Sequence, residues 1–105
     1  MMIFLSYNLS DKNTVTKEGA VTKSVFVHPH ALKHGIPEDE IRYAWINFVR
    51  SQQREVPNEE QIVRIGYGAT IETAIQMIGV IGVDGVLIIH ALTPPQRSII
   101  KELGL

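Results

Sequence analysis

The chain has 105 residues with 45% hydrophobic and 20% charged side chains, a composition typical of one globular domain with a single modest core. The absence of cysteine excludes disulfides and thiolate-bound metals, and a net charge of −1 gives no sign of the basic surface that nucleic-acid-binding proteins usually carry. The longest apolar stretch, residues 77–92, contains Asp84 and His90 and is too short to span a membrane, and residues 1–5 lack the basic start of a signal peptide, so we expect a soluble cytoplasmic protein.

Residues 1–24 carry one short apolar run, Ile3–Leu5, followed by a small, polar and aperiodic stretch. This composition predicts a flexible N-terminal arm, with an edge strand at Ile3–Leu5 as the alternative. The single domain is therefore expected to cover residues 25–105.

Two short helices are expected after a strand at residues 24–27. Pro29 suits the first position of one helix, and Gly35 suits its left-handed cap. Pro37 opens the second helix, whose first turn carries three acidic residues at the positive end of the helix dipole. The apolar residues of this helix recur at helical spacing: Ile41, Ala44, Trp45, Phe48 and Val49.

The rest of the chain predicts strands at residues 51–56, 61–67, 70–83 and 86–90, and the strand at 51–56 is expected at the outside of the sheet. A two-residue turn at Asp84-Gly85 would join the last two strands and place Gly79 opposite His90. Both faces of this hairpin are apolar, so either the chain sandwiches it or one face awaits a partner.

A last helix at residues 94–103 is expected to bury Ile99, Ile100 and Leu103. The predicted fold class is therefore α+β, with two N-terminal helices packed on about three or four antiparallel strands and a C-terminal helix.

His90 is a candidate catalytic residue because it closes a very apolar strand. Histidine titrates near neutral pH, so it can act as a general base or acid, and Gly79 opposite would leave room for a substrate. The alternative is a half-buried histidine bonded to the backbone at a strand end.

Three more histidines, His28, His30 and His34, fall within one short segment. His30 and His34 are four residues apart and can share a helix face, which suits a metal site with His90 as a further ligand. The favoured alternative is helix capping on an exposed surface, and no metal is predicted.

Arginine and lysine side chains supply candidates for binding an anion. Arg64 lies in the middle of a strand, where it lines a polar pocket or faces solvent, and Glu72 on the next strand is placed to pair with it. Arg97 and Lys101 are four residues apart on the last helix, where they clamp a phosphate or form a solvated face.

Several short motifs resemble those of BrnT-like toxins. Residues 30–36 (HALKHGI), followed by residues 38–41 (EDEI) and Ala44, are similar to the opening of that family. Residues 64–66 (RIG) resemble its next strand, and residues 86–91 with the Pro- and Arg-containing turn after them resemble its last strand and terminal helix. The likeness covers about residues 25–103.

The resemblance implies a RelE-superfamily fold and the toxin of a type II toxin–antitoxin system. Such a toxin is a ribonuclease that cleaves mRNA without a metal or other cofactor and is neutralised by a cognate antitoxin. By position, the resemblance places Lys33 and His34 in the family's helix-turn motif, Arg64 on its arginine-bearing strand and His90 at the end of its last strand. Leu92 stands where the family has an arginine, and Arg97 is the nearest guanidinium. The expected catalytic residues are therefore His90, Arg64, His34 and Arg97, and the expected substrate-binding residues are Lys33 and Lys101, the latter paired with Arg97 on the last helix. The alternative is a catalytically silent module of the same fold that binds a protein partner or dimerises.

Overall fold

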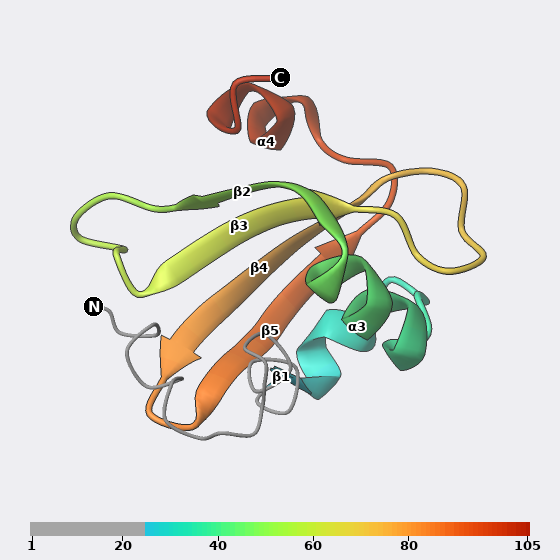
Figure 1. Cartoon of the computed structure of the whole chain (residues 1–105), viewed down its shortest axis with the longest axis horizontal. Helices are drawn as coiled ribbons and strands as arrows, with labels where there is room; N and C mark the ends of the chain where they lie inside the picture. The colour runs from blue at the N-terminus through green and yellow to red at the C-terminus, as the bar shows by residue number, and fades with distance from the viewer. Residues whose placement is uncertain (1–24) are drawn as a thin grey trace.

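The computed structural model describes residues 25–105, so the predicted arm and the edge strand at Ile3–Leu5 lie outside the described residues. Five strands form one sheet in the order β1-β5-β4-β3-β2, and two α-helices pack on it (Figure 1). The elements are β1 (Val25–Val27), the 3-10 turn η1 (Pro29–Leu32), α3 (Glu38–Ile46), β2 (Phe48–Gln53), β3 (Gln61–Gly66), β4 (Ile75–Gly82), β5 (Gly85–Leu92) and α4 (Arg97–Glu102).

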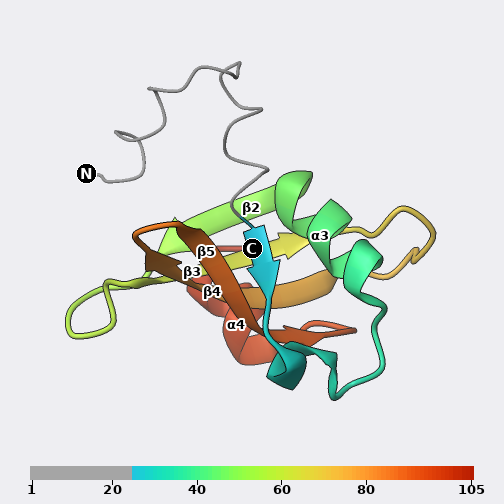
Figure 2. The same cartoon turned by 90° about the horizontal axis from the view of Figure 1, so that it is seen from below.

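The helices α3 and α4 cover opposite faces of the sheet, as the view from below shows (Figure 2). The face under α3 holds the larger core, which includes Ile41, Ala44, Trp45, Ile75, Met77, Ile88 and Ala91. The face under α4 holds a smaller cluster of Val63, Ile65, Ile99 and Leu103. Because neighbouring residues of a strand point to opposite faces, these two clusters assign a face to the strand residues around them, except where a bulge interrupts the alternation.

The predicted fold class, two N-terminal helices packed on three or four antiparallel strands in a RelE-like arrangement, is wrong. Four strands are antiparallel, but β1 pairs in parallel with β5 and makes the sheet five-stranded and mixed. In place of the first helix there is only the turn η1, because Pro29 and Gly35 leave room for little more than one turn. Gly35 then takes the predicted left-handed conformation (φ 84°), and Pro37 is extended (ψ 147°).

The helix α3 forms where it was predicted but ends before Phe48 and Val49. Asn47 leaves the helical conformation (φ −103°, ψ 47°), and its side-chain Nδ2 donates to the carbonyl of Tyr43 at 3.0 Å. An asparagine that bonds the backbone in this way competes with the next helical turn. The outer strand β2 therefore begins at Phe48 instead of Ser51, although its predicted place at the outside of the sheet is confirmed.

The hairpin of β4 and β5 forms as predicted, but its turn lies one residue earlier than expected. Val83 and Asp84 make the turn, and Gly82 pairs with Gly85. Gly85 has a φ of 133°, a conformation that residues with a side chain rarely adopt. Gly85 is therefore the first residue after the turn, whereas the prediction makes it the second residue of the turn.

A bulge then changes which residues face each other along this hairpin. Ile78 faces His90, and Gly79 faces Ile88, so the predicted pairing of Gly79 with His90 is wrong. The side chains of Val86 and Trp45 fill the space beside Gly79, since a Cβ on Gly79 would lie 2.6 Å from Cγ1 of Val86 and 2.7 Å from Cη2 of Trp45. The glycine therefore makes room for α3 and leaves none for a substrate.

The C-terminal helix α4 confirms the predicted burial of Ile99 and Leu103. It packs on the part of the sheet formed by β3 and β4, and Phe26 and Leu87 on the other strands remain exposed. Of the described helices, none is long and apolar enough to cross a membrane.

Candidate functional site

A buried amide, Gln76, links two strands to the start of α4. Its side chain is 1% exposed, and its Oε1 accepts the backbone N–H of Gln96 at 2.6 Å. Because a backbone N–H can only donate, this contact fixes the orientation of the Gln76 amide. Its Nε2 donates to Oε1 of Gln96 at 2.9 Å and lies 2.8 Å from Nε2 of His90, which must therefore be the unprotonated ring nitrogen.

His90 is thus held as a neutral imidazole whose proton sits on Nδ1. Burial lowers its pKa, and the positive charges of His34 and Lys33 add to the effect. The lone pair that a general base needs is already bonded to Gln76. The geometry is that of a half-buried histidine in a structural network, although its partner is a side chain instead of the backbone.

His34 and Lys33 are the predicted site residues that lie nearest to His90. The His34 ring meets the His90 ring edge-on with 6.0 Å between centroids, and both His34 and Lys33 are exposed. They follow η1, which packs on β5, in the turn that ends at Gly35, and this turn places His34 beside His90. This is the one point where the structure brings predicted catalytic residues together within residues 25–105.

The other two histidines act locally. The backbone N–H of His30 donates to Nδ1 of His28 at 2.9 Å, so His28 caps the start of η1. Across the described part of the chain, no group of three or more His, Asp or Glu side chains is placed to hold a metal ion.

Arg64 lies under the C-terminal end of α3. Its Nη1 donates to the carbonyl of Trp45 and its Nε to Oγ of Ser51, both at 2.9 Å. Its guanidinium carbon lies 4.4 Å from the ring centre of Trp45 and 4.1 Å from that of Phe48, so two aromatic rings enclose the cation. Burial lowers the pKa of Arg64 to about 10, which still leaves it charged at neutral pH.

Arg64 and His90 lie on opposite faces of the sheet. Arg64 faces Met77, and Met77 faces Ala91, so these three residues form one row on the α3 face. His90 precedes Ala91 and points to the α4 face, where it contacts Gln76. The two residues therefore cannot serve one cleft.

The predicted pairing of Glu72 with Arg64 is wrong. Glu72 lies in the loop before β4, and the residue of β4 beside Arg64 is Met77. Of the ion pairs between described residues, neither includes Arg64.

Arg97 and Lys101 are both exposed on α4. Arg97 directly follows Gln96, so the start of α4 lies next to the network of Gln76 and His90. The structure gives neither cation a hydrogen bond or an ion pair with another described residue. Of the six predicted site residues, His34, His90 and Lys33 thus gather in one place, Arg97 follows Gln96 at the start of α4, and Arg64 lies on the opposite face of the sheet from His90. Lys101 is exposed further along α4.

Sequence reasoning missed Gln76 as the centre of the polar network. Its signal was present, because Gln76 is the one polar residue in the apolar run of residues 75–83. A polar side chain in a buried strand needs a hydrogen-bonding partner. The enclosure of Arg64 by Phe48 could not be seen, since Phe48 was expected on a helix.

No family model, curated protein or solved structure matches this chain. The resemblance to BrnT-like toxins therefore rests on the short motifs of the sequence alone and stays a prediction.

Proposed function

We propose that this domain is a protein-binding module that acts without catalysis, and that its partner adds an extended segment to the open edge of β2. One observation carries the proposal: of the two outer strands, β1 has its free edge contacted by an arginine, whereas β2 has no such cover among the described residues.

The outer edge of β2 presents backbone groups that no described strand pairs with. The N–H of Arg54 donates to the carbonyl of Gln61 at 2.9 Å, so Arg54 faces β3. Because alternate residues of a strand face opposite sides, the N–H and C=O groups of Ser51 and Gln53 point outward. Such an edge is a template for a strand from another chain.

Exposed apolar side chains surround the start of β2. We name this group the α3–β2 corner; its members are Tyr43, Ile46, Phe48 and Val49. Phe48 is 42% exposed and Val49 is 58% exposed. Clustered apolar side chains on a surface favour interaction with a protein, and in strand addition they supply specificity beside the backbone bonds.

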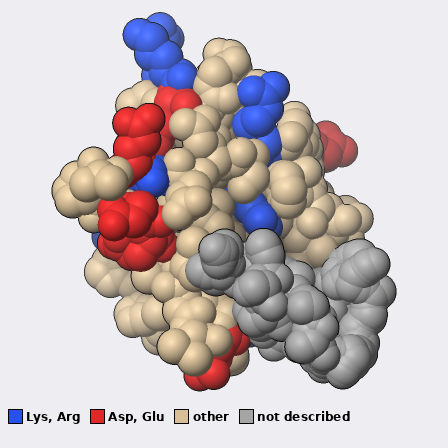
Figure 3. Space-filling model, turned by 60° about the vertical axis from the view of Figure 1, so that its left-hand side comes forward, with Lys and Arg blue, Asp and Glu red and all other residues tan. Residues whose placement is uncertain are grey.

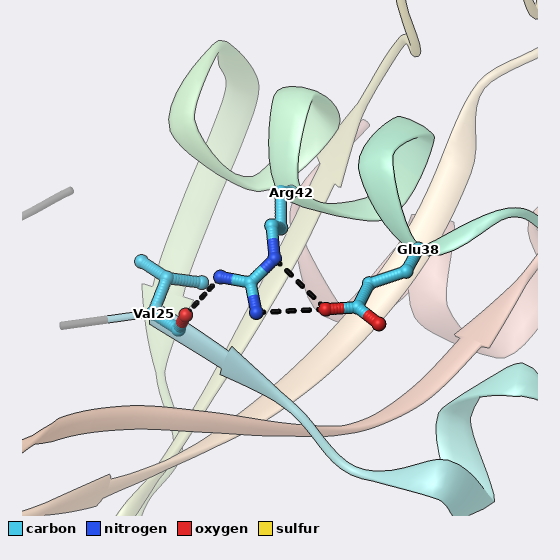
Figure 4. Close-up of polar contacts among 3 residues, drawn as sticks. All are labelled: Val25, Glu38 and Arg42. Carbon is cyan, nitrogen blue, oxygen red and sulfur yellow. Dashed lines mark hydrogen bonds and ion pairs between the residues drawn. The ribbon is translucent and has the colours of Figure 1, made fainter. Parts of the chain in front are cut away.

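The free edge of β1, unlike that of β2, is contacted by a side chain of α3. The N–H of His28 donates to the carbonyl of Ile88 at 2.9 Å, so the alternation along β1 turns the carbonyl of Val25 outward. Arg42 on α3 donates to this carbonyl, and an ion pair of 2.8 Å with Glu38 holds the arginine in place (Figure 4). A strand could not pair at Val25 without displacing Arg42.

The charge distribution supports a protein partner. On the face drawn in Figure 3, Lys and Arg side chains form separate patches between uncharged residues, and acidic side chains lie among them. A groove for RNA would need cations in a continuous strip. The cognate antitoxin that the resemblance implies, acting in the cytoplasm, would be a partner of the proposed kind.

A matched pair of variants tests the proposed edge. Val49 lies on β2 and Val83 in the turn between β4 and β5, where it is 94% exposed, so Val49→Lys and Val83→Lys each add one charge at an exposed valine. Tagged protein would capture a partner from a lysate of the source organism. We expect wild type and V83K to retain it and V49K to lose at least about tenfold in affinity. Equal retention by both variants would refute docking at β2.

A ribonuclease is the second candidate, because His34, His90 and Lys33 lie together. In such a ribonuclease the exposed His34 would act as the general base. His90 would position the His34 ring, because the lone pair of His90 is already bonded to Gln76. Purified protein should then cleave single-stranded RNA, with activity lost in His34→Ala and kept in Arg97→Ala. Intact RNA after incubation with wild type would reject this candidate.

A further inference from the structure

Arg64 is a partly buried cation without an acidic partner among the described residues. The ion pairs in this part of the chain join Arg42 to Glu38 and Arg54 to Glu102. A charge removed from water normally has a counter-charge, because its desolvation is unfavourable. The lowered pKa of Arg64 reflects this uncompensated burial.

The contacts of Arg64 orient its guanidinium without using all its donors. Nη1 is bonded to the Trp45 carbonyl and Nε to the Ser51 hydroxyl, while Nη2 has no partner within the described residues. A guanidinium carries more N–H donors than these two bonds use, and the remaining ones form a fork that matches a carboxylate. The rings of Trp45 and Phe48 pack against the guanidinium.

The side chain of Arg64 reaches toward the open edge of the sheet. Two of its contacts, Ser51 and Phe48, belong to β2, and Ser51 is directly opposite Arg64 in the ladder. A strand added at β2 would lie about 5 Å beyond Ser51, and one side chain of that strand would point to the same face as Arg64. A long acidic side chain there can reach the guanidinium.

We propose that Arg64 is the anchor for an Asp or Glu carboxylate of the partner segment, received between Trp45 and Phe48. The partner is then an acidic extended segment of another protein. This inference rests on the proposed function, since the carboxylate arrives on a strand paired with β2. A second copy of the chain fits less well, because β2 (FVRSQQ) offers Arg50 and no acid in return.

The surroundings favour a carboxylate over an RNA phosphate. The guanidinium of Arg64 packs on the rings of Trp45 and Phe48, and its planar fork matches a planar carboxylate in two parallel hydrogen bonds. Arg50, the arginine of β2, donates to the carbonyl of Leu103 at 2.9 Å on the α4 side. It therefore does not add a second cation to the site, as a phosphate backbone would require.

A direct test follows the Nε–H resonance of Arg64 by nuclear magnetic resonance while sodium acetate, sodium phosphate or sodium chloride is added. We expect the shift to saturate with acetate at a concentration several-fold lower than with phosphate or chloride. The indole N–H resonance of Trp45 should shift with the same acetate dependence in wild type and in Arg50→Lys. In Arg64→Lys it should not shift when acetate is added. A response to phosphate stronger than to acetate, or the same slope with all three salts, would overturn the inference.

Capture of the partner separates this inference from the proposed function. We expect Arg64→Lys to lose at least about tenfold in retained partner and Arg50→Lys to lose little, with the thermal unfolding of each variant as the folding control. If wild type and R64K retain the partner equally while V49K loses it, docking at β2 holds and the anchor is refuted. If acetate binds at Arg64 but V49K and V83K retain the partner equally, the anion site holds and docking at β2 is refuted.

Discussion

The two outer strands of this sheet differ in how their free backbone groups are treated. At β1, the carbonyl of Val25 turns outward and Arg42 bonds it, so the helix that covers the core also covers this edge. At β2, Ser51 and Gln53 turn their backbone outward and no described element covers them. An arginine contacts the free edge of β1 and no described element contacts that of β2, so the open edge belongs to β2 and is not a property of the whole sheet.

The largest expected effect comes from removing the side chain that fixes α3 in place, which would disturb both edges together. Trp45 is fully buried and its indole lies against Gly79. We expect Trp45→Ala to lower the free energy of unfolding by about 3–5 kcal/mol, measured by urea denaturation. Tyr43→Ala, on the exposed side of the same helix, should cost about 0.5 kcal/mol. Equal losses in both variants would contradict the role of Trp45 as the anchor of α3.

Gln76→Leu should destabilise the protein while leaving both edges intact. The substitution removes the acceptor for the N–H of Gln96 and the donor to His90 inside the sheet. We expect a loss of about 1–3 kcal/mol, because buried polar groups are left without partners. Binding of the partner should remain, measured on folded protein below its melting temperature. Loss of binding with an intact fold would mean that the docking surface extends to α4.

Arg42→Met should open the β1 edge without shortening the side chain. The variant loses the bond to Val25, and because Arg42 is partly exposed, we expect a stability cost of about 1 kcal/mol. The uncovered edge should exchange its amide hydrogens faster and promote self-association, which sedimentation would detect as a function of protein concentration. Unchanged exchange at β1 would show that Arg42 does not protect this edge.

The smallest expected effect is a pH dependence of protein stability that comes from His90. It should not change the difference between the covered edge of β1 and the open edge of β2. Burial lowers the pKa of His90 below the 6.5 of the unfolded chain, and charge interactions with His34, Lys33, Arg54 and His30 lower it further. As the pH falls, His90 is therefore protonated in the unfolded chain before it is protonated in the folded protein. The stabilisation that comes from neutral His90 is complete above pH 6.5 and is lost as the pH falls from 6.5 through the lower pKa of the folded state. Protonation would also put an N–H against Nε2 of Gln76.

His90→Gln should remove this pH step in thermal unfolding curves. A second loss at more acidic pH should remain in the variant, because hydrogen bonds from Thr70 lower the pKa of Glu40 below 4.5. That loss also runs toward acid, since the carboxylate form is the one that the fold stabilises. If H90Q kept the loss of stability that begins as the pH falls below 6.5, that loss would belong to another histidine.

Local pattern was enough to predict the main strands, the start of α3 and the burial of Ile99 and Leu103. The register of the last hairpin could not be derived locally, because the packing of Trp45 against Gly79 belongs to the tertiary structure. The parallel pairing of β1 with β5 also depends on residues far apart in the sequence.

The candidate site shows the same limit. Its residue types were visible in the sequence, but which face each one occupies depends on strand boundaries. The end of α3 at Asn47 moved Phe48 onto β2 and beside Arg64, and the bulge in the hairpin set the partner of His90. A buried glutamine within an apolar run was the one signal in the sequence that pointed to the network around Gln76.

Hydrogen exchange at the two edges of the partner-bound protein tests most directly whether β2 is the docking strand. The amide hydrogens of Ser51 and Gln53 should exchange markedly more slowly in the complex, and those of Val25 and Val27 should be unchanged. Slower exchange at Val25 and Val27, or at neither edge, would contradict docking at β2.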